Sequence, residues 1–91
     1  MLNKILEDYP EQDIIKFDGF DDCIIGCDID SENVRLIYSV SMMVKKLIEV
    51  DKMDEIDAVE HFEFNIRGTK LGNNTPILCQ DDFWNQTNTQ I

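Results

Sequence analysis

Residues 23–50 read CIIGCDIDSENVRLIYSVSMMVKKLIEV, and this stretch decides the fold. Hydrophobic residues alternate over residues 23–29 and again over 34–38, which predicts two half-buried strands. The face of the first strand predicted to meet the core consists of Cys23, Ile25, Cys27 and Ile29. The polar residues 30–33 between the two runs predict a turn, so the strands form an antiparallel hairpin. Because an isolated hairpin is marginally stable in water, another element must cover its apolar face.

Two helices that follow the hairpin are predicted to supply this cover. Ser39 is an expected N-cap, since its hydroxyl can accept a hydrogen bond from a free amide at the helix start. The stripe of this first helix is made of Val40, Met43, Val44, Leu47 and Ile48. Asp54 is the expected cap of a second helix over 55–67, and Gly68 suits the left-handed residue just after it. The core edge of the second helix is predicted to be Val59, Phe62 and Ile66.

The flanking segments complete an α+β prediction. Residues 2–9 carry the spacing of a short amphipathic helix, and residues 75–79 indicate a short third strand at a sheet edge. We therefore expect a short N-terminal helix, then a two- or three-stranded antiparallel sheet made of the hairpin and the short edge strand, and two consecutive helices packed against this sheet. Residues 1–84 are expected to form a single domain and residues 85–91 a frayed C-terminal tail.

Negative charge is the strongest global feature of the 91-residue chain. Nineteen acidic residues face eight basic ones, for a net charge of −11, and residues 1–32 alone hold ten acidic and two basic residues. Such a charge repels nucleic acid and anionic lipid and attracts basic protein surfaces, so neither direct nucleic-acid binding nor membrane binding is expected. The predicted partner-binding residues are Asp18, Asp21, Asp22, Asp28, Asp30 and Glu32.

Catalysis is not expected from this sequence. The only histidine is His61, and the four glycines are scattered, so no phosphate-binding glycine-rich loop is present. Adjacent carboxylates occur, but acid–base pairs of the glycosidase type come from separate elements around a cleft. The chain is therefore predicted to be a binder and not an enzyme.

Two ligand sets for a divalent metal ion, zinc or another, can be drawn from the sequence. The oxygen set is Asp18, Asp22, Glu60 and Glu63, and it requires the acidic loop to fold over the second helix. The alternative set is Cys23, Cys27, His61 and Cys79. Cys23 and Cys27 would lie about 13 Å apart on an extended strand, which is too far for one tetrahedral ion. The three thiols are otherwise read as small buried hydrophobic groups, and Arg67 is the expected partner of Glu63.

Two strings resemble the signature of a family of small acidic proteins encoded by bacteriophages and prophages. The first is DGFDD at residues 18–22 with IIG at 24–26. The second is EHFEFN at 60–65, followed by Gly68, Gly72 and TPI at 75–77. The resemblance covers about residues 17–78, and the cysteines of this chain depart from the small or apolar residues expected there.

A phage origin implies that the protein acts in the host bacterial cytoplasm. The sequence agrees with this expectation, because it shows neither a long apolar run nor a secretory signal. By type, small acidic phage proteins without a catalytic motif are similar to type II anti-CRISPR proteins, which bind Cas9. The expected function is then non-enzymatic inhibition of a host nucleic-acid effector, above all a CRISPR nuclease, by blocking target-DNA loading. A metal-binding regulator of a host protein is the alternative, and a structural virion component is a third. The oligomeric state is left open.

Overall fold

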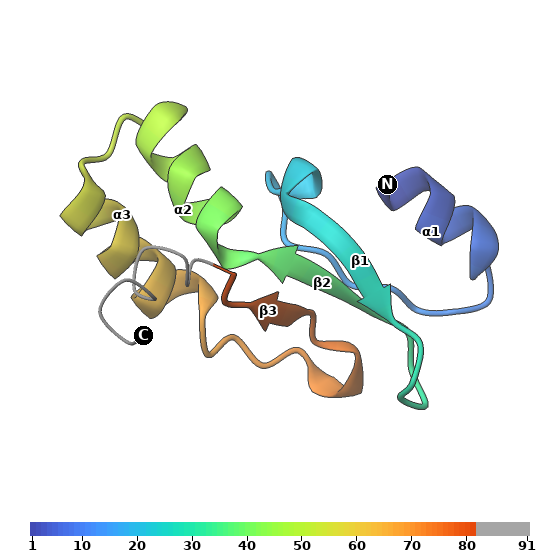
Figure 1. Ribbon diagram of the computed structural model, residues 1–91. Helices are drawn as coiled ribbons and strands as arrows, with labels where there is room; N and C mark the ends of the chain where they lie inside the picture. Colours follow the sequence, from blue (N-terminus) through green and yellow to red (C-terminus); the bar gives the residue numbers. More distant parts are fainter. Residues whose placement is uncertain (82–91) are drawn as a thin grey trace, which may run out of the picture.

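A computed structural model describes residues 1–81 of the chain (Figure 1). The elements are α1 (Leu2–Asp8), the 3-10 turn η1 (Asp21–Cys23), β1 (Ile24–Asp28), β2 (Arg35–Ser39), α2 (Val40–Glu49), α3 (Glu55–His61), the π-helical turn η2 (Phe62–Ile66), the 3-10 turn η3 (Gly72–Asn74) and β3 (Ile77–Cys79). This order confirms the α+β prediction, with its hairpin, third short strand and two consecutive helices. The predicted tail 85–91 lies outside the described residues.

The hairpin contains a β-bulge that the alternating pattern did not predict. Ile24 pairs with Tyr38, but Gly26 pairs with Ile37, so Ile25 is an extra residue in β1. Because side chains alternate from face to face along a strand, one extra residue exchanges the two faces. The predicted inward face is therefore right only in part. Cys23 is buried and Cys27 packs partly buried against the core, but Ile24 is buried in place of Ile25, which is 41% exposed, and Ile29, beyond the strand, is 68% exposed.

β2 is the centre of the sheet and of the core. Val34, Leu36 and Tyr38 are all buried, as their alternation predicts. The sheet order is β1–β2–β3, and β3 runs parallel to β2. The expectation of an entirely antiparallel sheet is thus wrong. The chain passes through α2 and α3 before it returns, and a crossover of this length is what permits parallel pairing.

The predicted helix caps are confirmed. The amide of Met42 donates to the Ser39 hydroxyl at 3.2 Å, and the amide of Asp57 donates to Asp54 at 2.8 Å. Met43 and Leu47 are buried along α2 and join the cluster around Leu36 and Tyr38. The hydrophobic stripe of α2 therefore does cover the sheet.

The second helix meets the core through a different row of side chains than predicted. Ala58 is fully buried and Val59 is 44% exposed, while Phe62 and Ile66 are buried as expected. The helix widens into the π-turn η2, in which the amide of Arg67 donates to the Phe62 carbonyl at 2.9 Å. Ala58, Phe62 and Ile66 are spaced four residues apart and share one buried face, so Ala58 takes the position assigned to Val59.

Candidate functional site

The six predicted partner-binding carboxylates form two groups. Asp18, Asp21 and Asp22 lie before β1, at and within η1, whereas Asp28, Asp30 and Glu32 lie at its far end, in the hairpin tip. β1 spans about 13 Å at the usual rise of an extended strand, and the first group lies before its start whereas the second begins at its last residue, Asp28. The structure therefore does not bring the six together in one compact patch.

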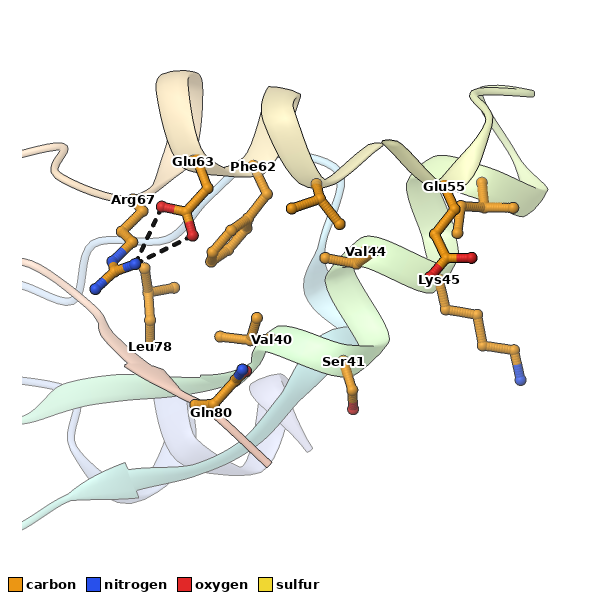
Figure 2. Close-up of a pocket in the computed structure, with 12 residues that line it drawn as sticks. Val40, Ser41, Val44, Lys45, Glu55, Phe62, Glu63, Arg67, Leu78 and Gln80 are labelled. Atoms are coloured by element: carbon orange, nitrogen blue, oxygen red, sulfur yellow. Dashed lines mark hydrogen bonds and ion pairs between the residues drawn. The ribbon is translucent and has the colours of Figure 1, made fainter. Parts of the chain in front are cut away.

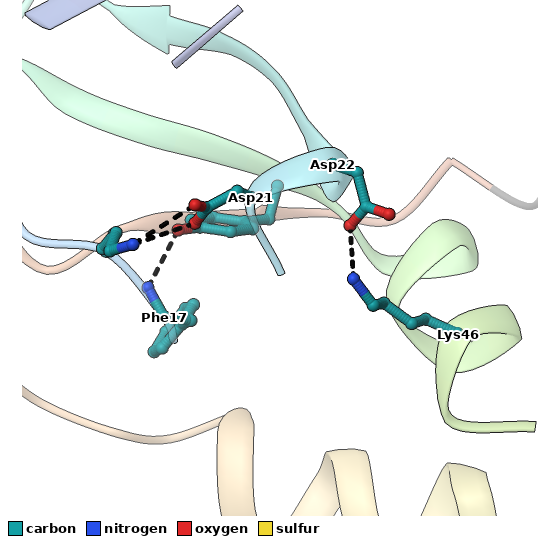
Figure 3. Close-up of polar contacts among 6 residues, drawn as sticks. Phe17, Asp21, Asp22 and Lys46 are labelled. Atoms are coloured by element: carbon teal, nitrogen blue, oxygen red, sulfur yellow. Dashed lines mark hydrogen bonds and ion pairs between the residues drawn. The ribbon is translucent and has the colours of Figure 1, made fainter. Parts of the chain in front are cut away.

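Lysines neutralise part of the first group (Figure 3). The Lys16 ammonium lies 3.2 Å from Asp21, and the Lys46 ammonium lies 2.8 Å from Asp22. The hydrogen bond from Lys46 holds the pKa of Asp22 below its ordinary value. Within residues 1–81, Asp18 forms no ion pair. Ion pairs within the chain therefore already compensate much of the negative charge expected at η1.

The loop that carries Asp18 is anchored to the core through one buried hydroxyl. The amide of Phe17 donates to the Tyr38 hydroxyl oxygen at 2.8 Å, and the two rings lie 5.2 Å apart at 57° (Figure 3). Gly19 has φ +87°, a conformation that glycine adopts without strain. The acidic turn before η1 is therefore fixed in place by groups that are not themselves charged.

The hairpin tip is the second acidic group, and backbone bonds define its shape. Asp28 accepts a hydrogen bond from the amide of Asp30 at 2.9 Å, and this bond is the main cause that lowers the pKa of Asp28. The Ser31 hydroxyl donates to the Asn33 carbonyl at 2.6 Å. Within residues 1–81, neither Asp30 nor Glu32 is in an ion pair.

We refer to the segment 28–32 as the acidic tip. Both Asp30 and Glu32 are exposed, and the exposed Ile29 lies beside them. Uncompensated carboxylates next to an exposed hydrophobic side chain suit contact with a basic protein surface.

The oxygen ligand set does not assemble in the described chain. Glu63 lies at the start of η2 and receives two hydrogen bonds of 3.1 Å from Arg67, which confirms the predicted partner. Asp22 is engaged by Lys46, as described above. Across residues 1–81, no three or more His, Cys, Asp or Glu side chains form a group that could hold a metal ion. Glu60 and Asp18 are accordingly not part of such a group.

The sulfur ligand set is likewise dispersed over residues 1–81. Cys23 is buried, and desolvation, reinforced by the neighbouring Asp22, raises the pKa of its thiol to about 11. Cys27 and Cys79 are free and partly buried. The Nδ1 atom of His61 lies 3.2 Å from the side-chain amide of Asn65. A high thiol pKa makes Cys23 a poor metal ligand or nucleophile and agrees with its role in the core.

A groove between α2 and α3 is a feature that the sequence analysis missed (Figure 2). It encloses about 530 Å³. Its apolar lining is Val40, Val44, Ile48, Val59, Phe62 and Leu78. Its charged lining is Lys45, Glu55, Glu63 and Arg67, with two charges of each sign. The signal in the sequence was the breadth of the α2 stripe, but only the folded structure shows that Val40, Val44 and Ile48 line an open groove.

Comparisons with known proteins identify no relative. No protein-family model, no curated protein and no solved structure matches the chain. Among the helices of residues 1–81, none combines the length and the apolar character needed to cross a membrane.

Proposed function

We propose that this protein is a phage-encoded, non-enzymatic inhibitor that binds a host nucleic-acid effector with a basic channel, specifically a CRISPR nuclease of the Cas9 type. The observation that carries the proposal is the acidic tip, where Asp30 and Glu32 project uncompensated charge from a chain of net charge −11. The host bacterial cytoplasm would be its place of action.

Charge complementarity is the physical basis of the binding step. A Cas9-type nuclease holds its guide and target duplex in a positively charged channel. A compact acidic protein approaches such a channel quickly, because complementary potentials accelerate association and disfavour partners of like charge. Once bound, it occupies space that target DNA needs, so inhibition requires no chemical turnover.

The acidic tip is better suited to this contact than η1. The carboxylates of Asp21 and Asp22 would have to leave Lys16 and Lys46 before they could meet a partner, which subtracts from the gain on binding. Asp30 and Glu32 have no such pair to break within residues 1–81. The proposal therefore places the main contact at the hairpin tip, with η1 in a secondary role. Among residues 1–81, no arrangement of ligands favours the metal-binding regulator, and the proposed mechanism uses no metal ion.

The test is capture of a Cas9–guide complex by the purified protein at low and high salt, followed by measurement of target-DNA loading. We expect stoichiometric capture at low salt, much weaker capture at high salt, and loss of DNA loading in the captured complex. Metal content measured on the same sample checks the alternative function. Absence of capture at every salt concentration contradicts the proposal.

Two double variants with the same change in net charge locate the contact. Asp30→Lys with Glu32→Lys reverses the acidic tip, and we expect it to weaken capture roughly tenfold or more at low salt, since like charges would face each other. Glu49→Lys with Asp51→Lys makes an equal charge change at two exposed positions, the last residue of α2 and a residue just beyond it, and should retain most of the binding. Equal losses in the two variants would show that only net charge matters and would remove the acidic tip from the mechanism.

A further inference from the structure

A second cavity gathers positive charge in this acidic protein. It encloses about 530 Å³ and lies against β3 and the loop 67–76, which runs beside β3 (Figure 1). Three of the eight basic residues of the chain line it, namely Arg35, Arg67 and Lys70. No Asp or Glu among residues 1–81 lines it. We call it the cationic cavity.

The three basic side chains come from separate segments and retain unused donors. Arg35, on β2, is held by a hydrogen bond from its Nε to the Thr75 carbonyl at 2.6 Å, and within residues 1–81 its two terminal nitrogens form no hydrogen bond. Arg67 gives only one nitrogen to Glu63. Lys70 is in no ion pair of the described chain. Guanidinium groups fixed at one end in this way suit carboxylate or phosphate oxygens.

The loop that closes the cavity has a defined shape. Gly68 and Gly72 both have φ +90°, which other residues adopt only with strain. The Thr75 hydroxyl accepts from the amide of Leu71 and donates to the Gly72 carbonyl, each at 2.7 Å. A site held in its binding geometry loses less conformational entropy when a ligand enters.

The remaining wall of the cavity is hydrophobic. It includes Phe17, Ile66, Pro76, Ile77 and Leu78. Ile66 and Pro76 are buried, so they form a fixed floor. An apolar wall next to a few convergent polar groups is the usual composition of a small-molecule site.

We propose that the cationic cavity binds a small organic anion, with a carboxylate or phosphate group against Arg35, Lys70 and the free nitrogens of Arg67 and an apolar body against the floor. The charge of −11 on the whole chain does not prevent this. Salt screens charges more than about 8 Å away at physiological ionic strength, so the groups near the cavity set its local field. Glu63 offsets part of the charge of Arg67 and Asp28 lies opposite Arg35 in the sheet, whereas Lys70 is in no ion pair among residues 1–81. The proposal does not rest on the proposed binding of a nuclease by the acidic tip.

The test is an NMR titration of the 15N-labelled full chain with phenyl phosphate, benzoate, inorganic phosphate and phenol. We expect saturable shifts of the Gly68, Lys70 and Gly72 amides with the two aromatic anions. Inorganic phosphate should bind more weakly because it lacks the apolar body, and phenol should cause no such shifts because it lacks the charge. Sodium chloride at matched ionic strength should not reproduce the shifts.

Three variants decide whether the cavity is responsible. Arg35→Gln and Lys70→Gln should each weaken phenyl phosphate binding roughly tenfold or more, as expected for loss of a charge-assisted hydrogen bond. Lys45→Gln removes the same charge on α2, outside the cavity, and should leave the affinity unchanged. Lys70→Gln keeps the test valid if Arg35→Gln, which also loses the bond to Thr75, fails to fold. The absence of saturable shifts, or equal weakening by Lys45→Gln, would overturn the proposal.

Discussion

Replacing Ser39 by alanine should destabilise the protein more than any other loss of a single hydroxyl on α2. Ser39 is fully buried between β2 and α2. Its oxygen accepts from the Met42 amide at 3.2 Å, and its proton goes to a carboxylate oxygen of Asp81. The other oxygen of Asp81 accepts from the Ser41 amide at 3.0 Å. One hydroxyl thus caps α2 and ties the segment after β3 to the start of that helix.

The size of the effect follows from these two bonds. Loss of a serine N-cap costs about 1 kcal/mol. A hydrogen bond to a charged group is worth about 1.5–3 kcal/mol when buried, and we reduce this to about 1 kcal/mol because Asp81 is exposed and water can replace the hydroxyl. The sum is about 2 kcal/mol. For a domain of this size, that lowers Tm by roughly 8–16 °C.

The pH dependence of the Ser39→Ala variant gives a second readout. Burial acts to raise the pKa of Asp81, but hydrogen bonds from Ser39 and Ser41 outweigh it and hold the pKa below its ordinary value of 3.8. A carboxylate with a lowered pKa adds stability above its unfolded pKa, and this stability is lost as pH falls through the folded pKa. The variant should therefore lose less stability than the parent protein on acidification.

The assay is thermal and urea unfolding of the parent and variant at neutral and acidic pH. Ser41→Ala is the matched control, because Asp81 keeps the backbone amide of Ser41 when the hydroxyl is removed. We expect the control to lose less than half as much stability. A Tm within the error of the parent for Ser39→Ala, or a larger loss for Ser41→Ala, would refute the assigned bond network.

Three further predictions each concern one residue. Tyr38→Phe leaves the Phe17 amide without its acceptor and should cost about 1–2 kcal/mol in urea unfolding, and an unchanged midpoint would contradict the anchoring role of the hydroxyl. Gly68→Ala should cost about 1–2 kcal/mol through backbone strain at φ +90°. A methyl group at this position would meet no neighbouring atom, so a steric clash adds nothing to the cost. Gly26→Ala is the control, since its methyl group also meets open space but its φ is not positive, and it should cost less. Cys23 should resist thiol reagents at pH 8 until the protein unfolds, while the other two cysteines react in the native state. Because burial raises the pKa of the Cys23 thiol from its ordinary value of 9.0 to about 11, the stability of the protein should also fall as pH rises from about 9 to about 11.

Local signals in the sequence predicted the helices well. Ser39 and Asp54 act as caps within three residues of their partners, and the α2 stripe depends only on helical spacing. The same locality explains the confirmed pair of Glu63 and Arg67. Such features need no knowledge of the rest of the chain, so pattern and spacing suffice.

The features that sequence failed to predict depend on distant parts of the chain. The bulge at Ile25 reflects how β1 registers against β2, and alternation alone cannot detect it. The bond between Ser39 and Asp81 joins residues 42 apart in sequence. The parallel direction of β3 follows from the route of the chain through α2 and α3. The acidic residues were recognised, but their lysine partners at η1 were not, because the pair of Asp22 and Lys46 spans the hairpin.

The exposed edge of β1 has a consequence for solubility. β1 lies at one edge of the described sheet, and its bulge turns Ile25 outward, next to an edge where another strand could pair. Proteins prevent such edge-to-edge aggregation with charges and irregular strands. Here Asp22 precedes the strand, Asp28 is its last residue, and the bulge disrupts its pairing surface. The acidic residues thus act as gatekeepers that keep one copy of the sheet from joining another. Variants that neutralise them should therefore aggregate more readily than variants that reverse their sign.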